Sequence, residues 1–147
     1  MPRLTLALLV SACVLSLAAC GGSRGLTKAQ YDAKVSHLCL VAADVLRELH
    51  LTYTIGDYRH NGTTIVRVGE HFDKALAALK PPSSMASDAA AFLAASREVA
   101  GVMKSAVAAA NVRHVARFVE AMHQASRDAA NQSRWAQTIA ATGCYIA

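Results

Sequence analysis

The sequence predicts an all-α protein that folds as an antiparallel four-helix up-down bundle, and three observations lead to this prediction. From residue 27 onward, apolar residues recur at spacings of three and four, which is the period of one helix face. No segment shows the strict alternation of a half-buried strand. The connections between the helical stretches are short, and short connections join antiparallel neighbours in a bundle.

The first helix is expected to begin at Thr27, because Thr27 and Gln30 have the spacing of a capping box. We expect this helix to end at Gly56 and to be followed by a loop over residues 57–62, which are rich in turn-forming residues. Its apolar face consists of Tyr31, Val35, Leu38, Ala42, Val45 and Leu49.

The second helix is expected to begin at Thr63 or Thr64. The pair Pro81–Pro82 ends it, because proline lacks an amide hydrogen and disfavours helical geometry in the preceding residue. Its apolar face consists of Ile65, Val68, Phe72, Leu76 and Leu79. Ser83 or Ser84 can cap the third helix. The apolar face of that helix consists of Met85, Ala89, Phe92, Ser96, Val99, Met103, Ala106 and Ala110.

No glycine or proline separates the third helix from the fourth, so the phase of the apolar pattern decides the boundary. Continuing the third face would bury Arg113, Arg117 and Glu120. A new face instead consists of Val112, Val115, Val119, Met122, Ala125, Ala129, Ser133, Ala136 and Ala140. We therefore place a break at Asn111, a favourable N-cap residue, with a single long helix as the alternative. Gly143 fits the end of the fourth helix.

The amino terminus has the features of an export signal. Arg3 precedes an uncharged apolar stretch, residues 4–17, which is shorter than the roughly twenty residues of a membrane-spanning helix. The segment Leu17-Ala18-Ala19-Cys20 then resembles the lipobox of bacterial lipoproteins. In that family a diacylglycerol is attached to the cysteine, and cleavage just before it implies that Cys20 is the first mature residue. An ordinary secretory signal, which would leave Cys20 as a plain thiol, is the alternative.

The lipobox interpretation predicts three segments. They are a signal peptide that is removed (residues 1–19), the lipidated cysteine with a flexible tether (20–26), and a helical bundle domain (27–147). The five residues 21–25 span on average only about 12 Å, so the bundle is expected to stay close to the outer surface of the membrane. Loss of Arg3 lowers the formal charge of +5 by one, to +4. This excess is too small to indicate binding to nucleic acid.

The four cysteines reduce to one candidate pair. Cys13 leaves with the signal and Cys20 carries the lipid, so Cys39 and Cys144 remain. Outside the cytoplasm, two remaining cysteines are expected to form a disulfide. Antiparallel first and fourth helices would bring them together, provided that the fourth helix stops early or folds back. A metal ligand or reactive thiol at Cys39 lacks a supporting CxxC motif or neighbouring ligands.

Candidate sites for chemistry are few. Glu120 and His123 have the Glu-x-x-His spacing of metal ligands on one helix face, but di-iron bundles use this motif twice and here it occurs once. A surface copper or zinc site drawn from the six histidines is the other metal candidate. Neither is strong enough to predict a cofactor. The motifs of serine hydrolases, metalloproteases and phosphate-binding loops do not occur, so we do not expect an enzyme.

A basic face on the fourth helix is the remaining candidate site. Its arginines lie opposite the apolar face and could contact phospholipid headgroups or an acidic wall polymer. They are Arg113, Arg117, Arg127 and Arg134. A charged outer face is also what any bundle helix requires.

Four features characterise the chain. They are the lipobox, the segment Leu26–Tyr31 at the start of a helix that carries Cys39, the segment Leu76–Pro82 at the end of a helix, and Gly143-Cys144 near the carboxyl terminus. In these the mature chain is similar to a loose group of small helical lipoproteins and secreted proteins of actinobacteria. The group has no established activity, so the resemblance implies fold, disulfide and location only. We expect a membrane-anchored envelope lipoprotein that acts as a non-enzymatic binding or structural module with an envelope protein partner. A carrier of a small ligand (lipid, haem or metal) is the alternative.

Overall fold

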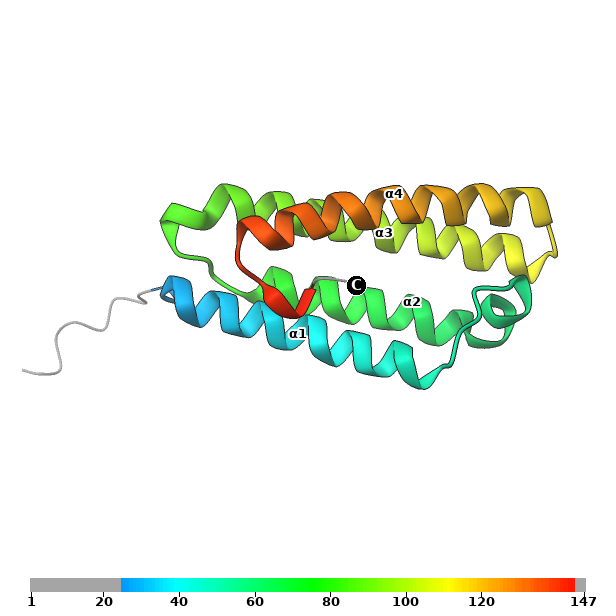
Figure 1. Ribbon diagram of the computed structural model, residues 1–147, viewed down its shortest axis with the longest axis horizontal. Coiled ribbons are helices and arrows are strands. Elements are labelled where there is room, and N and C mark those ends of the chain that lie inside the picture. The colour runs from blue at the N-terminus through cyan, green and yellow to red at the C-terminus, as the bar shows by residue number, and fades with distance from the viewer. Residues whose placement is uncertain (1–24, 145–147) are drawn as a thin grey trace, which may run out of the picture.

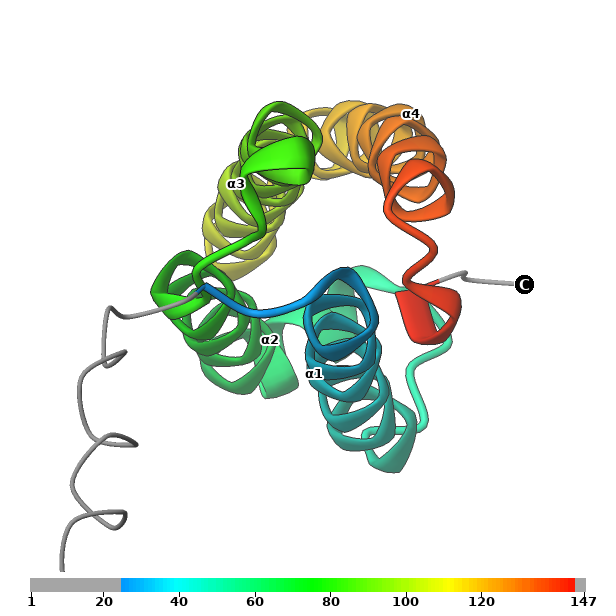
Figure 2. The same ribbon diagram turned by 90° about the vertical axis from the view of Figure 1, so that its left-hand side faces the viewer.

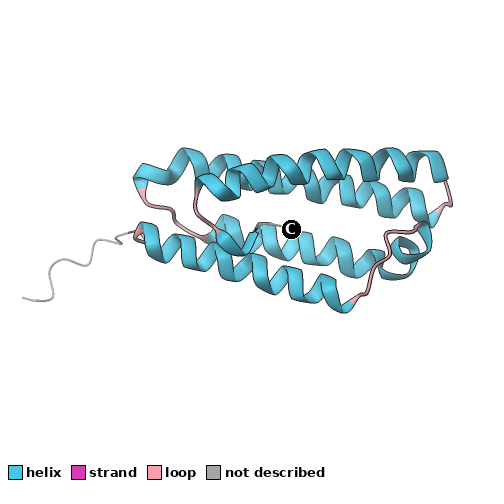
Figure 3. Cartoon of the chain, viewed as in Figure 1, coloured by secondary structure: helices cyan, strands magenta, loops and turns pink. Residues whose placement is uncertain are grey.

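The computed structural model describes residues 25–144, which form four α-helices and two short 3-10 segments (Figures 1 and 3). The α-helices are α1 (Lys28–Glu48), α2 (Ile55–Ala78), α3 (Ala86–Asn111) and α4 (Val115–Thr138). The 3-10 segments are η1 (Ser83–Met85) and η2 (Thr142–Cys144). Since these residues contain no strand, the prediction of an all-α four-helix bundle is confirmed. In Figure 1 successive helices run in alternating directions along the long axis.

Seen end-on, the helices follow one another around a ring, with η2 between α4 and α1 (Figure 2). α3 packs extensively on both α4 and α2, whereas α1 packs on α2 and on η2. α1 and α4, which the sequence predicts to be neighbours, contribute to one core cluster but make little direct contact, because η2 lies between them (Figure 2). Within residues 25–144, no helix is both long and apolar enough to cross a bilayer.

The start of α1 agrees with the sequence, but the boundary between α1 and α2 does not. The Thr27 hydroxyl accepts a hydrogen bond from the Gln30 amide, and the Gln30 side chain accepts one from the Thr27 amide, which completes the capping box. The predicted end at Gly56 is wrong, because α1 ends at Glu48 and α2 begins at Ile55.

A second capping box explains the early start of α2. The Asp57 carboxylate accepts hydrogen bonds of 2.8–3.0 Å from the backbone amides and hydroxyls of Thr52 and Thr54. The predicted loop over residues 57–62 is therefore the first part of a helix. Gly62 does not form a turn; it allows close packing on α3, since a Cβ there would lie 2.5 Å from a methyl carbon of Val107.

The break between α3 and α4 is confirmed, and the single long helix is excluded. α3 ends at Asn111, Arg113 has a φ of 55°, and the N-cap of α4 is His114. His114 Nδ1 accepts a hydrogen bond of 3.3 Å from the Arg117 amide. The predicted N-cap at Asn111 is thus wrong by three residues. The predicted serine cap of α3 is also wrong, because Ser83 and Ser84 form η1 and Met85 precedes the helix without a side-chain cap.

The core consists of two clusters of buried side chains. One surrounds Tyr31, Phe92 and Ile139 near the disulfide, and the other surrounds Tyr58 and Phe118 toward the opposite end. Edge-to-face pairs of Phe72 with Phe92 and of Tyr58 with Phe118 contribute one aromatic contact to each cluster.

The predicted apolar face of α4 is wrong in its first two turns. Val112, Val115 and Val119 are 75%, 62% and 45% exposed, while Phe118 is buried. Because the helix starts only after His114, its buried face is set by Phe118, Ala121, Ala125 and Ala136. Val45 on α1 was also expected in the core and is exposed.

Candidate functional site

The candidate lipid attachment site, Cys20, lies outside the described residues, as does the expected signal segment, residues 1–19. The described chain starts at one end of the bundle, where Gly25 lies against the backbone of Lys80 and Pro81. A Cβ built on Gly25 would lie 3.5 Å from the Pro81 carbonyl oxygen. Gly25 therefore lies where α1 begins and α2 ends.

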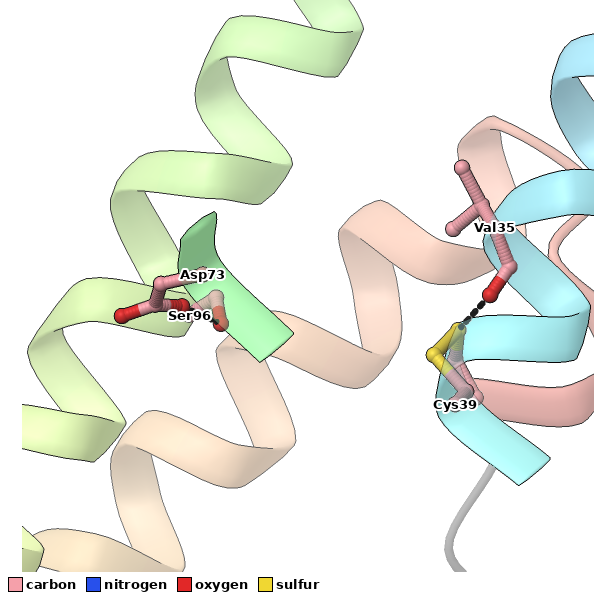
Figure 4. Close-up of a disulfide and its surroundings, with 5 residues drawn as sticks. Val35, Cys39, Asp73 and Ser96 are labelled. Carbon is pink, nitrogen blue, oxygen red and sulfur yellow. Dashed lines mark hydrogen bonds between the residues drawn. A yellow bond between two sulfur atoms is a disulfide. The ribbon is translucent and has the colours of Figure 1, made fainter. Parts of the chain in front are cut away.

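The structure contains the expected disulfide between Cys39 and Cys144, two residues 105 positions apart with a Cα–Cα distance of 5.0 Å (Figure 4). The condition for its closure is also met, because α4 ends at Thr138 and Ala140, with a φ of 54°, redirects the chain toward α1. Cys144 Sγ lies 3.9 Å from the carbonyl oxygen of Val35, a contact without a hydrogen bond because a disulfide sulfur has no proton to donate.

Gly143 makes this closure possible. A Cβ at this position would lie 2.4 Å from the Ser36 carbonyl oxygen and 3.0 Å from Leu40 Cγ. Residue 143 therefore must be glycine for η2 to lie on α1. The sequence predicted a helix end at Gly143, which is wrong, since the residue belongs to η2 and is required by close approach.

The metal candidates do not form a set of three or more ligands among the described residues. Glu120 and His123 are both exposed on α4. Within residues 25–144, which include all six histidines, no group of three or more His, Cys, Asp or Glu side chains is placed to hold a metal ion.

The four candidate arginines of the basic face are exposed but do not form one patch. Arg117 and Arg134 are separated by about 26 Å along the helix axis, at 1.5 Å per residue. Arg127 donates a hydrogen bond to Gln124 and Arg134 donates one of 3.0 Å to Asn131, so both are held along the helix by neutral side chains. Arg113 lies in the turn before α4. This surface is a row of separate charges.

Two partly buried polar contacts link helices inside the bundle. The Ser96 hydroxyl of α3 donates a hydrogen bond of 2.5 Å to the Asp73 carboxylate of α2 (Figure 4). The Tyr58 hydroxyl donates to Met103 Sδ at 3.7 Å, and burial raises the pKa of Tyr58 to about 12. The first contact joins α2 to α3 at Asp73 and Ser96, and the second joins the same two helices at Tyr58 and Met103.

An apolar hollow between α1 and α2 is a feature that the sequence did not indicate. Its volume is about 580 Å³. The residues that line it are Ala33, Lys34, His37 and Leu38 of α1, Ala75 and Ala78 of α2, and Leu79. The hollow lies at the end of the bundle where Gly25 is, because Leu79 is two residues from Pro81.

One exposed lysine lines this hollow and two more are adjacent in sequence to lining residues, and we call the three the lysine rim. Lys34 lines the hollow, Lys74 lies one helical turn before Ala78, and Lys80 follows Leu79. The ion pairs within residues 25–144 are Lys28–Asp32, Arg47–Asp44 and Lys104–Glu70, so no lysine of the rim has a carboxylate partner. The sequence held a signal for this site, since four of the five lysines lie in residues 28–80.

Comparison with known proteins gives no match: no family model, no curated protein and no solved structure resembles this chain at a significant level.

Proposed function

We propose that this protein is a lipoprotein of the cell envelope, anchored outside the cytoplasm through a diacylglycerol on Cys20, and that it acts as a non-enzymatic binding or structural module. The observation that carries the proposal is the sequence Leu17-Ala18-Ala19-Cys20 directly after a short apolar stretch. Its resemblance to a lipobox is specific because the small residues and the cysteine occur together at the end of that stretch.

Two features of the fold support this proposal. The Cys39–Cys144 disulfide suits an oxidising compartment, since cytosolic thiols are kept reduced. The described chain begins at one end of the bundle, so a lipid on Cys20 would hold that end of the bundle near the membrane.

A binding module is favoured over a carrier that uses the bundle interior. Many buried positions are alanine, and helices with small side chains at their contacts approach closely and leave little space between them. The expected ligand is then a protein partner in the envelope that contacts an outer surface. The hollow between α1 and α2 is the one observation that favours the second candidate, a carrier of a small apolar ligand.

Intact mass spectrometry of the full chain, expressed in a bacterium that processes lipoproteins, tests the proposal. The membrane fraction should yield residues 20–147 with a diacylglycerol and two hydrogens fewer than the reduced chain. The Cys20→Ala variant is the matched control and should lose the lipid while retaining the disulfide. A secreted product with a free Cys20 thiol would refute the lipid anchor. Native spectra of the same material would reveal a carrier through excess mass that leaves on denaturation.

A further inference from the structure

We propose that the outer face of α1 and α2 is the surface that lies against an anionic lipid bilayer. This α1–α2 face consists of the apolar hollow, the lysine rim, and the exposed Val41 and Val45. The inference rests on the proposed lipid anchor for the presence of the membrane, and it assigns the side of the bundle that meets the headgroups.

Apolar side chains continue the hollow along α1. Val41 follows Leu38 by three residues and Val45 follows Val41 by four, so the three side chains share one helix face. Val41 is 49% exposed and Val45 is 37% exposed. An apolar strip flanked by lysines is the pattern of a surface that sits at the boundary between headgroups and acyl chains.

The lysines of the rim can contact anionic headgroups because they form no ion pairs within the described residues. Three carboxylates of α1 and α2 are engaged elsewhere, because Asp73 is bonded to Ser96, Glu70 pairs with Lys104, and Asp32 pairs with Lys28. Glu48, one turn beyond Val45 at the end of α1, has no ion pair among the described residues, so the positive charge of this face is concentrated at the end that carries the hollow. Each lysine close to an anionic membrane surface strengthens the association by about fivefold, or about a hundredfold for three.

The tether brings the membrane to this face. Five residues between the lipid and Gly25 reach at most about 17 Å when extended, and Gly25 lies beside the lysine rim at Lys80. Exposed valines near arginines also occur at the start of α4, but that region is at the opposite end of the bundle (Figure 1). In the ring, the outer surfaces of α1 and α2 and of α3 and α4 are on opposite sides, so one flat membrane meets only one of them (Figure 2).

Depth-dependent fluorescence quenching tests the proposal on the processed protein purified from membranes and reconstituted into vesicles. Trp135, the single native tryptophan, is replaced by phenylalanine in every variant. Val41→Trp then reports on the α1–α2 face, and Val119→Trp, at a position of similar exposure on α4, is the matched control. With brominated lipids in vesicles of about one-third anionic lipid, we expect severalfold stronger quenching at position 41 than at 119. The difference should be lost in neutral vesicles.

Charge variants show whether the lysine rim causes the docking. Replacing Lys34, Lys74 and Lys80 with glutamine should reduce quenching at position 41 to its value in neutral vesicles. The matched replacement of Arg117, Arg127 and Arg134 with glutamine should leave it unchanged. Equal quenching at both positions, or stronger quenching at 119 that depends on the arginines, overturns the proposal. Intact mass spectrometry of the same samples shows separately whether Cys20 carries a lipid. The two results are independent, because quenching by anionic vesicles can be measured whether or not a lipid is attached.

Discussion

The two sides of the bundle are held together in different ways. α3 and α4 pack through small residues, and Ala106, Ala109 and Ala110 of α3 are buried against Ala121 and Phe118 of α4. α1 buries only Tyr31, Val35 and Cys39, and it exposes several large apolar side chains in its second half. It is linked instead by a disulfide to η2.

This difference shows how a chain rich in alanine can form a stable bundle while part of the apolar surface of α1 stays exposed. Small side chains give α3 and α4 a close interface whose stability comes from dispersion and buried area. α1 has less of such an interface, so a covalent link made outside the cytoplasm supplies part of its attachment. Two of the apolar residues that α1 does not bury, Val41 and Val45, remain available on the α1–α2 face.

The largest expected effect comes from removing the covalent link. The Cys39→Ser/Cys144→Ser variant should lose about 4–5 kcal/mol of unfolding free energy, because the disulfide closes a loop of roughly a hundred residues. Urea denaturation of the oxidised protein and the variant measures this loss. Hydrogen exchange should rise more in α1 than in α3 and α4, and a uniform rise in all four helices would contradict the comparison.

The next effect concerns the contact that allows the link. Gly143→Ala should lower the free energy of unfolding by about 3 kcal/mol, because the new Cβ would meet a helix carbonyl of Ser36 that cannot easily retreat. Gly101→Ala on α3 is the matched control, since a Cβ there meets no atom within 4 Å. That control should be neutral or stabilising by up to about 1 kcal/mol. Similar denaturation midpoints for the two variants would show that η2 adapts to the added methyl group.

Two substitutions, one at a buried position of α3 and one at an exposed position of α1, compare the two sides directly. Ala106 of α3 is 0% exposed, so Ala106→Val should overpack the α3–α4 interface and lower the free energy of unfolding by about 2 kcal/mol. Val45→Ala on the exposed side of α1 should change it by less than about 0.5 kcal/mol. Denaturant unfolding of both variants gives the two values. A larger loss for Val45→Ala would mean that α1 depends on this face for its attachment.

Local signals explain which parts of the fold the sequence predicted. The capping box at Thr27 and Gln30 depends on four consecutive residues, and the disulfide follows once two cysteines have been assigned to the signal and the lipid. The break between α3 and α4 was predicted from the phase of the charged residues. Each of these signals can be read without knowing what packs on the helix.

The sequence predictions are wrong where one residue type is compatible with two structural roles. Gly62 looks like a turn residue, but it is a contact point that only the position of Val107 reveals. The apolar pattern placed Val115 and Val119 in the core and not Phe118. The start of α4 after His114 sets the rotation of the helix, which buries Phe118 and exposes both valines. The hollow between α1 and α2 depends on the positions of two helices, so the sequence offered only the uneven distribution of lysines.

The smallest effect distinguishes the starts of α1 and α2, which use the same capping motif with different chemistry. Hydrogen bonds from the Thr54 amide and the Thr52 hydroxyl lower the pKa of the exposed Asp57 carboxyl. A folded-state pKa below the unfolded value of about 3.9 stabilises the fold at higher pH, and this stabilisation is lost as the pH falls through the folded value. Asp57→Asn should therefore lower the melting temperature at pH 7, and its difference from the wild type should shrink below about pH 4. Gln30→Ala removes a neutral cap from α1, so its effect should persist at low pH. Thermal unfolding between pH 3 and 7 tests both, and a loss for Asp57→Asn that does not change with pH would show that Asp57 acts through its shape and not through its charge.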